Sequence, residues 1–410
     1  MSRPRVSEGP LSTSSRRRRR NPWNRLRQAL LPAVTAVLTC VLPAAATNGT
    51  VWTTLAPLPA ARDFLGAAAA PCPPGQTGTC VYAMGGRDAL GNATTPSSVS
   101  GRAESFNRLT NAWSTVRPMP TPRWGFGTAS APCPPGQTGT CVYTVGGYTA
   151  FALTGPDVPV ATVESYNPVT NAWSTVAALP APRGSLAAAA APCPPGQTGT
   201  CVYAVGGADG TGTPLGQVHS YNPVTNAWSQ PAPLPTPRLG LAAAASTCPP
   251  GQTGFCVYAM GGVDGTGTIQ ATVRSYNPAT NAWSPVEPLP TGRYLLAAAA
   301  APCPPGQTGT CVYTVGGRSG PGFNTTGAVE SYNPVTNAWT TLPALPTARS
   351  HLAAAAMQCP PGQGATCVYA TGGSSPTGLQ STVDALDPPL DEPAGDRAVG
   401  GRVTGGASGP

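Results

Sequence analysis

The sequence predicts an all-β fold, a six-bladed β-propeller with four-stranded antiparallel blades, closed by an N-terminal strand that joins the C-terminal blade. Two observations predict it. One pattern recurs along the chain: an arginine, an alanine-rich run, two cysteines, a Gly-Gly pair, a Tyr-Asn-Pro-like turn and Asn-Ala-Trp. The tryptophans of this pattern lie 55 to 61 residues apart, a period that accommodates four short strands. The copies begin near Arg62, Arg123, Arg183, Arg238, Arg293 and Arg349.

The alanine-rich run after each arginine is predicted to be the innermost strand. In the third copy it covers residues 186–191, one leucine followed by five alanines. Alanine favours helices, but the run is short and ends at Pro-Cys-Pro-Pro, through which no helix continues. Small side chains also suit the crowded axis of a radial array. We therefore expect strands here, with helical alanine runs as the alternative.

Three more strands follow in each copy. The second begins at the second cysteine of the pair and runs to Gly-Gly, and the third covers 162–167 in the second copy. Asn-Pro-Val-Thr-Asn at 167–171 is a tight turn with an early proline. The fourth strand is predicted over 172–180, where a proline ends it. The recurring tyrosine and tryptophan, Tyr166 and Trp173 in this copy, are expected to pack between neighbouring blades.

Twelve of the thirteen cysteines form six pairs with the same spacing of eight. An even number of regularly spaced cysteines indicates disulfides, which here would staple the first two strands of each copy where they leave their turn. A metal site is disfavoured because there is no C-x-x-C and the chain has only two histidines. The predicted pairs are Cys72 with Cys80, Cys133 with Cys141, Cys193 with Cys201, Cys248 with Cys256, Cys303 with Cys311, and Cys359 with Cys367.

The two ends of the repeat array complement each other. Residues 51–54 have the pattern of a fourth strand with no first three before it, and the last copy ends after a third strand, 381–387, without Asn-Ala-Trp. The N-terminal strand is therefore predicted to complete the last blade. Residues 391–410 are rich in proline, glycine and charge, and they are predicted to be a disordered tail.

Residues 1–46 are predicted to be a secretory signal peptide, cleaved near Ala46 and followed by the propeller over 47–390. They hold nine arginines and one acid, and an uncharged run follows from residue 29. An uncleaved membrane anchor is the alternative, although Pro32 and Pro43 weaken such a helix. A secreted or extracytoplasmic location follows, with no membrane contact once the leader is removed. Because the leader carries the whole formal charge of +8, nothing in the repeats indicates a nucleic-acid partner.

Over roughly residues 51–390, the recurring Gly-Gly, tyrosine and tryptophan resemble the kelch repeat. The resemblance implies a kelch β-propeller of the secreted, bacterial six-bladed type, and kelch domains generally resemble interaction scaffolds. It also implies two enzymatic alternatives, a galactose-oxidase-like protein and a sialic-acid mutarotase. Copper chemistry of the first kind needs two histidines and two tyrosines. It is disfavoured because neither His219 nor His351 is beside a tyrosine.

Comparison of the copies separates constant segments from variable ones. The connectors between the cysteines and the Asn-Pro turns are nearly constant and are expected at one end of the strands, whereas the links at the other end vary. We predict that this variable end, around the mouth of the channel, binds a protein or carbohydrate partner. The alternative is that these links vary without any ligand. The candidate residues are Trp124, Tyr294, Tyr148, Arg87, Arg318, Asp63 and His351.

The six recurring arginines have two interpretations, a cationic ring for a carboxylate ligand or a structural contact within each blade. Their strict recurrence favours the structural contact. An acid occupies one third-strand position in four copies, but His219 and Arg274 replace it in the third and fourth copies, so an Arg–acid pair is not expected in every blade. The acids are Glu104, Glu164, Glu330 and Asp384.

A binding scaffold makes the fewest demands on these residues, so a non-enzymatic role is favoured and no catalytic residue is assigned. A mutarotase needs an acid–base group near the mouth, for which Asp63, Arg87 and His351 are the available residues. No metal or organic cofactor is implied, and a monomer is expected.

Overall fold

The computed structural model describes residues 51–88, 98–149, 157–361 and 366–387. It divides the chain into two units, Met1–Thr47 and Asn48–Pro410, and all described residues lie in the second. They contain strands and no helix, which confirms the all-β prediction. The signal peptide predicted over 1–46 and the tail predicted over 391–410 lie outside the described residues.

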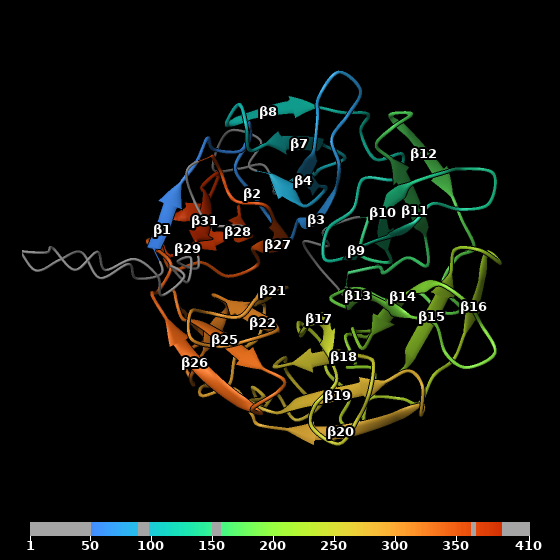
Figure 1. The fold of residues 1–410 in the computed structure, drawn as a ribbon, viewed down its shortest axis with the longest axis vertical. Coiled ribbons are helices and arrows are strands. Elements are labelled where there is room, and N and C mark those ends of the chain that lie inside the picture. Colours follow the sequence, from blue (N-terminus) through green and yellow to red (C-terminus); the bar gives the residue numbers. More distant parts are fainter. Residues whose placement is uncertain (1–50, 89–97, 150–156, 362–365, 388–410) are drawn as a thin grey trace, which may run out of the picture. The chain divides into compact units, whose positions relative to one another are not determined.

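Six four-stranded antiparallel sheets, called blades one to six, build the second unit (Figure 1). Blade one has β3 (Gly66–Pro71), β4 (Thr79–Met84), β7 (Ala103–Asn107) and β8 (Ala112–Thr115); blade two has β9 (Gly127–Pro132), β10 (Thr140–Val145), β11 (Val163–Asn167) and β12 (Ala172–Thr175); blade three has β13 (Ala187–Pro192), β14 (Thr200–Val205), β15 (Val218–Asn222) and β16 (Ala227–Ser229). Blade four has β17 (Ala242–Thr247), β18 (Phe255–Met260), β19 (Val273–Asn277) and β20 (Ala282–Val286); blade five has β21 (Ala297–Pro302), β22 (Thr310–Val315), β25 (Val329–Asn333) and β26 (Ala338–Leu342); blade six has β27 (Ala353–Met357), β28 (Cys367–Thr371), β31 (Val383–Asp387) and β1 (Val51–Thr54).

Short additional strands lie in the links between these strands, and they form one three-stranded and two two-stranded sheets. They are β2 (Arg62–Asp63), β5 (Arg87–Asp88) and β6 (Ser98–Val99) in blade one, β23 (Arg318–Ser319) and β24 (Asn324–Thr325) in blade five, and β29 (Ser374–Ser375) and β30 (Gly378–Leu379) in blade six.

The alanine-rich runs are the innermost strands of the blades, as predicted (Figure 1). In β13 the alanines alternate between buried and half-buried, because successive side chains of a strand point to opposite faces. Ala187 and Ala189 are buried, and Ala188 is half-buried and lines the channel. The strands are close enough that a Cβ added at Gly127 would lie 2.7 Å from Cβ of Ala188 in the next blade. Small residues are therefore required here, and the helix propensity of alanine is overridden.

All six predicted cysteine pairs are disulfides. The second cysteine of each pair is fully buried in a hydrophobic core cluster. The second strand was predicted to begin at this cysteine, and it does so in blade six, but in blades one to five it begins one residue earlier. These six cysteines are structural and offer no surface to a ligand. They are Cys80, Cys141, Cys201, Cys256, Cys311 and Cys367.

The disulfide hairpins and the Asn-Pro turns share one end of the blades. In blade two, Cys133–Cys141 joins the two strands of the first hairpin beside its connector. Asn167, in the turn after β11, donates from Nδ2 to Oε1 of Gln137 in that connector at 2.9 Å. We call this end the fixed face. The opposite end, with the links after the arginines and the Gly-Gly pairs, is the variable face.

The outer strands bind neighbouring blades together. Trp173 in β12 donates from Nε1 to the carbonyl oxygen of Arg117 at 2.8 Å, and the Arg117 N–H donates to Oδ1 of Asn171 at 2.8 Å. The Tyr166 ring lies between Trp173 of its own blade and Tyr82 of blade one, with centroid distances of 5.2 and 5.5 Å. These contacts agree with the expected packing role. The fourth strand is shorter than predicted, because β12 ends at Thr175 and the chain then turns toward the next blade.

The N-terminal strand completes blade six, as the ends of the array predict. β1 pairs antiparallel with β31, with Trp52 opposite Leu386 and Thr54 opposite Asp384. Trp52 also donates from Nε1 to the carbonyl oxygen of Pro343 in the link from blade five, at 2.8 Å. Blades six and one are in direct contact through β27 and β3, as the other neighbouring blades are through their inner strands.

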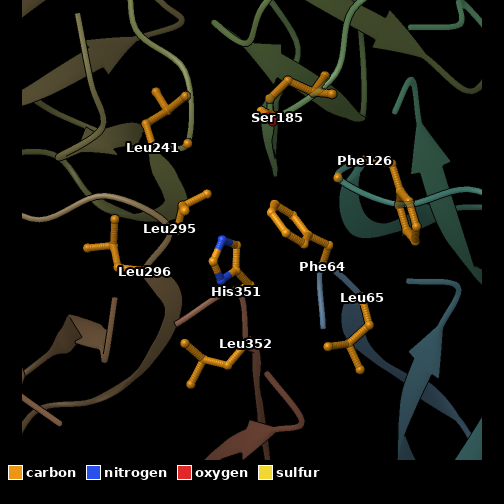
Figure 2. A pocket seen from close by; sticks show the side chains of 12 residues that line it. Phe64, Leu65, Phe126, Ser185, Leu241, Leu295, Leu296, His351 and Leu352 are labelled. Carbon is orange, nitrogen blue, oxygen red and sulfur yellow. The ribbon is translucent and has the colours of Figure 1, made fainter. Parts of the chain in front are cut away.

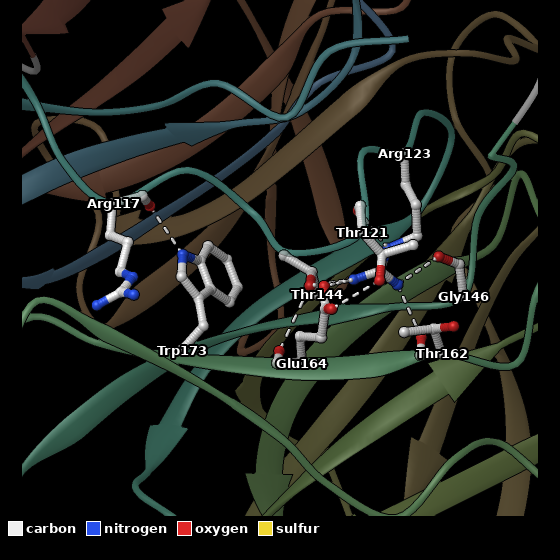
Figure 3. A network of polar contacts seen from close by, with 8 residues as sticks. All are labelled: Arg117, Thr121, Arg123, Thr144, Gly146, Thr162, Glu164 and Trp173. Carbon is white, nitrogen blue, oxygen red and sulfur yellow. Dashed lines mark hydrogen bonds and ion pairs between the residues drawn. The ribbon is translucent and has the colours of Figure 1, made fainter.

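The recurring arginines are structural. Arg123 is fully buried and donates from Nη1 to the carbonyl oxygens of Gly146 and Thr162, at 2.8 and 2.7 Å (Figure 3). Its Nη2 donates to Oγ1 of Thr144 and to Oε2 of Glu164, each at 2.7 Å. The same arginine therefore joins the link before the blade to its second and third strands. Arginine–acid pairs occur in four blades: Arg62–Glu104, Arg123–Glu164, Arg293–Glu330 and Arg349–Asp384.

Candidate functional site

Six residues surround the axis at the variable face, each two positions after the arginine of its blade. Each donates its backbone N–H to the carbonyl oxygen of the equivalent residue in the preceding blade, at 2.7–3.1 Å. The bond from Phe64 to His351, at 2.8 Å, joins blade one to blade six. We call these residues the mouth ring: Phe64, Gly125, Ser185, Gly240, Leu295 and His351.

Every member of the mouth ring has a left-handed backbone, with φ between 52° and 62°. This conformation costs a non-glycine residue on the order of 1 kcal/mol or more. Four of the six positions carry that cost, and the hydrogen bonds between blades offset it. Glycine at the other two, Gly125 and Gly240, adopts the conformation without strain. The mouth is therefore held by backbone geometry, so its side chains can differ from blade to blade.

The mouth ring encloses a cavity of about 90 Å³ (Figure 2). The ring forms its rim, and the apolar residue after each member, such as Leu65 or Phe126, lines it too. This volume holds a few water molecules or one small side chain of a partner. A second cavity of about 290 Å³ is lined by three consecutive residues from each of the six inner strands, most of them alanines. The side chains that line both cavities are mostly apolar, but about half of the wall surface of each is polar.

Arg87 is a charged residue that lies beside Phe64 of the mouth ring. It makes two bonds to the Asp63 carboxylate, from Nε at 3.0 Å and from Nη2 at 2.8 Å. Its guanidinium carbon also lies 4.4 Å from the Phe64 ring centroid and 5.0 Å from that of Trp124. Stacking of this kind favours arginine over lysine, because the guanidinium is planar and weakly hydrated. The predicted residues Asp63, Arg87 and Trp124 are thus brought together.

Trp124 and Tyr148 lie beneath this surface. Their rings stack with centroids 4.5 Å apart, and their exposed fractions are only 4% and 6%. The two residues also pair through their backbones, which fixes both side chains. They support Phe64 and Arg87 from below, so a partner at the mouth would meet those two side chains first.

His351 completes this arc from blade six. Its ring centroid lies 4.0 Å from that of Phe64, and its Nδ1 is 2.9 Å from Oγ of Ser350. Arg318 donates from Nε to the same hydroxyl at 3.3 Å. Burial, together with the charges of Arg318 and Arg87, lowers the pKa of His351 to about 3. The imidazole is therefore neutral at physiological pH.

Tyr294 and Arg318 extend the site toward blade five. They are bridged through their backbones, and both side chains are half-buried. The Tyr294 ring meets the exposed Phe323 edge-on, with centroids 5.8 Å apart. The structure thus places all seven predicted residues on the variable face, over blades one, two, five and six. Blades three and four present small or aliphatic residues at the same positions, such as Ala208 and Leu239.

Five of the six members of the mouth ring were not predicted as site residues: Phe64, Gly125, Ser185, Gly240 and Leu295. A signal for them exists in the sequence, because glycine occurs at the equivalent position of two copies, Gly125 and Gly240. Two glycines at one repeat position indicate a backbone that favours positive φ. They would have pointed to a special conformation at the mouth in every blade.

Both histidines are expected to make the fold sensitive to mild acid. The pKa of His219 is lowered to about 4, first by burial and then by Arg183, and that of His351 to about 3. In the unfolded chain both have pKa values near 6.5. Below about pH 6.5 the unfolded state binds protons that the folded state does not, so the free energy of unfolding falls by up to about 1.4 kcal/mol per pH unit for each histidine.

Urea unfolding of the protein and of His219→Gln and His351→Gln, between pH 7 and pH 5, measures this slope. Each single substitution should remove about half of it. Equal slopes in all three proteins would contradict the assignment.

Among the described residues, one group of potential metal ligands comes close together, Cys359, Cys367 and Asp387. The two cysteines are joined in a disulfide and so offer no thiolate. The geometry of this group therefore supports no metal centre.

The repeats of this chain match a known family. The family described as Kelch motif matches at residues 68–120, 129–180, 189–235, 253–290 and 299–346, together more than half of the chain. The chain belongs to the kelch family. Its kelch repeats confirm the predicted resemblance and indicate a β-propeller scaffold for protein interaction.

Curated relatives agree with this family. The kelch chain is 28% identical to Kelch-like protein 25 of Xenopus tropicalis over 294 residues, which cover 70% of the chain and 44% of that relative. It is 26% identical to Kelch-like protein 35 of Mus musculus over 186 residues, 45% of the chain and 27% of the relative. Kelch-like protein terF of Aspergillus terreus is 30% identical over 143 residues, 33% of the chain and 28% of the relative. The chain thus spans less than half the length of each of these relatives.

A solved structure, that of YjhT, shares the fold. It superimposes with a TM-score of 0.55 at 15% identity, covering 81% of this kelch chain and 95% of its own. The likeness supports the β-propeller and nothing finer. Within the part of the chain that the structure describes, no helix has the length and apolar character needed to cross a membrane.

Proposed function

We propose that this kelch propeller is a secreted binding scaffold that holds a protein partner on its variable face, with the mouth cavity at the centre of the contact. The difference between its two faces supports this most. The fixed face repeats the same disulfide hairpins and Asn-Pro turns, whereas the variable face gathers an arginine stacked on two aromatic rings beside a small cavity. Arginine and aromatic residues at the rim of a small pocket are typical of contact hot spots. The six disulfides agree with an oxidising, extracytoplasmic location.

Paired arrays of extracellular proteins and of glycans, probed with the purified protein, test the proposal. The informative variant is Phe64→Ser, because Ser185 already occupies the equivalent left-handed position of blade three. Val224→Ser on the fixed face is the matched control, since Val224 is 61% exposed in an Asn-Pro turn. We expect a protein partner whose affinity falls at least about tenfold, or 1.4 kcal/mol, with Phe64→Ser and is unchanged in the control. A glycan as the best ligand, or a loss of affinity only in the control, would contradict it.

The enzymatic alternative, a carbohydrate-active enzyme such as a sialic-acid mutarotase, finds little support in the geometry. Asp63 is held by two bonds from Arg87, and the pKa of His351 is lowered to about 3. General acid–base catalysis works best with a pKa near the working pH. Incubation with sialic acid and with galactose, followed by anomer exchange and by peroxide release, tests this alternative. Turnover in either assay would favour an enzyme.

A further inference from the structure

Blade four breaks the pattern of the buried arginines. In four blades the Nη2 atom of the arginine donates to a carboxylate, and in blade three it meets Nδ1 of His219 at 3.1 Å. In blade four the equivalent atom, Nη2 of Arg238, has no hydrogen-bond partner, although the residue is fully buried. A buried charged donor without a partner costs several kcal/mol.

The rest of the Arg238 side chain is placed like that of Arg123 in blade two. Its Nη1 donates to the carbonyl oxygens of Gly261 and Thr272, at 2.9 and 2.8 Å, and its Nε to that of Thr236 at 3.4 Å. These three contacts reproduce those of Arg123 with Gly146, Thr162 and Thr121, at 2.8, 2.7 and 3.3 Å. The guanidinium of Arg238 therefore points Nη2 at the position where a carboxylate would lie.

That position carries a second arginine. Arg274 pairs with Ala259 across β19 and β18, in the register in which Glu164 pairs with Thr144 in blade two. The Nε of Arg274 is also buried without a partner, and no acid lies within ion-pair distance of it among the described residues. Burial and the charge of Arg274 lower the pKa of Arg238 to about 10. Two like charges thus stand at the positions where four of the other blades hold opposite ones.

The neighbouring acid does not compensate them. Asp264 acts on Arg238 in the opposite sense, but less strongly than burial and Arg274 do. Its Oδ1 accepts bonds from Thr266 and Thr268, and its Oδ2 accepts one from Gln270 at 2.6 Å. Its carboxylate is therefore held by its own loop.

We propose that Arg238 and Arg274 bind a small monovalent anion of the size of chloride, in the place that a carboxylate oxygen occupies in the other blades. Thr236 corresponds to Thr121, whose hydroxyl donates to Glu164 at 2.8 Å, so a third donor stands at the equivalent position. Ala259 stands in the place of Thr144, so the hydroxyl that accepts from Nη2 of Arg123 in blade two is missing in blade four as well. The anion supplies the missing counter-charge.

Such an anion is linked to folding, because the unfolded chain has no preformed site for it. A ligand that binds only the folded state multiplies the folded-to-unfolded ratio by one plus its concentration over its dissociation constant. At about ten times the dissociation constant this is roughly an elevenfold increase. The test is chemical unfolding of the protein in mixtures of sodium chloride and sodium gluconate at constant ionic strength, since gluconate is a bulky organic anion that cannot take the place of one carboxylate oxygen.

We expect the unfolding midpoint of the protein to rise with chloride and to saturate. Arg274→Glu restores the acid of the other blades, so it should abolish the chloride response and be as stable in gluconate as the original protein is in chloride. Arg117→Glu, the same charge change at an exposed arginine, should keep the response. The proposal is overturned by an unchanged chloride response in Arg274→Glu, or by no saturable response in the original protein.

Bromide provides a direct readout besides stability. In crystals grown with sodium bromide, an anomalous peak should lie between the guanidinium groups of Arg238 and Arg274 and be absent from Arg274→Glu. No peak at that position in the original protein would also overturn the proposal.

Discussion

Replacing Glu164 with alanine is expected to lower the free energy of unfolding by about 3–5 kcal/mol, because it leaves a buried arginine without its counter-charge. Arg123 is fully buried, and Glu164 is 2% exposed. Burial already lowers the pKa of Arg123, and Glu164 acts against that shift. Two donors lose their acceptor at once, Nη2 of Arg123 and the hydroxyl of Thr121, whereas the Thr144 hydroxyl keeps the backbone carbonyl of residue 164. Urea unfolding at neutral pH measures the loss.

Two further variants separate the ion pair from packing. Glu164→Gln keeps a side-chain acceptor for these two donors and should cost less than Glu164→Ala. The double substitution Arg123→Met with Glu164→Leu removes both charges and should recover part of the lost stability, because apolar pairs of similar volume replace buried ion pairs well. The recovery is partial because the carbonyl oxygens of Gly146 and Thr162 lose the donor Nη1 of Arg123. A loss below about 1 kcal/mol for Glu164→Ala, the range of exposed pairs, would show that the pair is not structural.

Removal of β1 is the second large effect that we expect. A chain that starts at Leu55 lacks the fourth strand of blade six, whereas one that starts at Asn48 keeps it. The deletion removes the Trp52 bond to Pro343 and the Thr54 hydroxyl bond to Asp384, both of which hold blade six. It also exposes β31, whose Ala385 and Leu386 are fully buried. We expect a loss of about 3–5 kcal/mol, on the scale of a large core truncation, because the deletion uncovers buried residues of β31.

A peptide of residues 48–58 should restore the deleted chain in trans, because it carries the whole of β1. The same peptide with Trp52→Ser should not. Thermal unfolding with and without each peptide measures the rescue. Equal stability of the two chains, or equal rescue by both peptides, would mean that blade six does not need β1.

Much of the fold could be predicted from the repeat, because the assignment of each strand in one copy can be compared with the same segment of the other copies. Alanine runs predict helices by propensity, but Pro-Cys-Pro-Pro at their ends and the radial period predict strands, and strands are found. The cysteine spacing predicted every disulfide, and the incomplete first and last copies predicted the pairing of β1 with β31. The main error was the length of the fourth strand, since β12 ends at Thr175. Here a proline marked the end of the link rather than the end of the strand.

The candidate site was predicted less completely, because sequence shows which residues vary but not which way they point. Trp124 and Tyr148 vary between copies, yet they stack beneath the surface. Phe64 directly follows Asp63 in the sequence. Its side chain reaches the rim because its left-handed backbone turns it toward the axis. Which side chains of such a short link face the mouth cannot be predicted from the sequence unless this left-handed backbone conformation is known. The clustering of Arg87, Phe64 and His351 also joins blades one and six, which lie at opposite ends of the sequence.

Blade four illustrates a different limit. The sequence shows that Arg274 stands where other copies have an acid, and it predicts the absence of a pair there. Only the hydrogen bonds of Arg238 show that its guanidinium keeps its usual place and leaves one donor directed at an uncompensated position.

Hydrogen exchange of the backbone amides of β1 in the full chain tests the closure of the propeller most directly. The backbone N–H of Leu55 donates to the carbonyl oxygen of Val383 at 2.9 Å. Hydrogen-bonded pairs recur every two residues along an antiparallel ladder, so Thr53 and Ala385 form the next such pair. The account predicts that amides of Val51–Thr54 exchange as slowly as those of Ala172–Thr175, the equivalent strand of blade two. Exchange at the rate of an unstructured chain in Val51–Thr54, while Ala172–Thr175 stays protected, would contradict it.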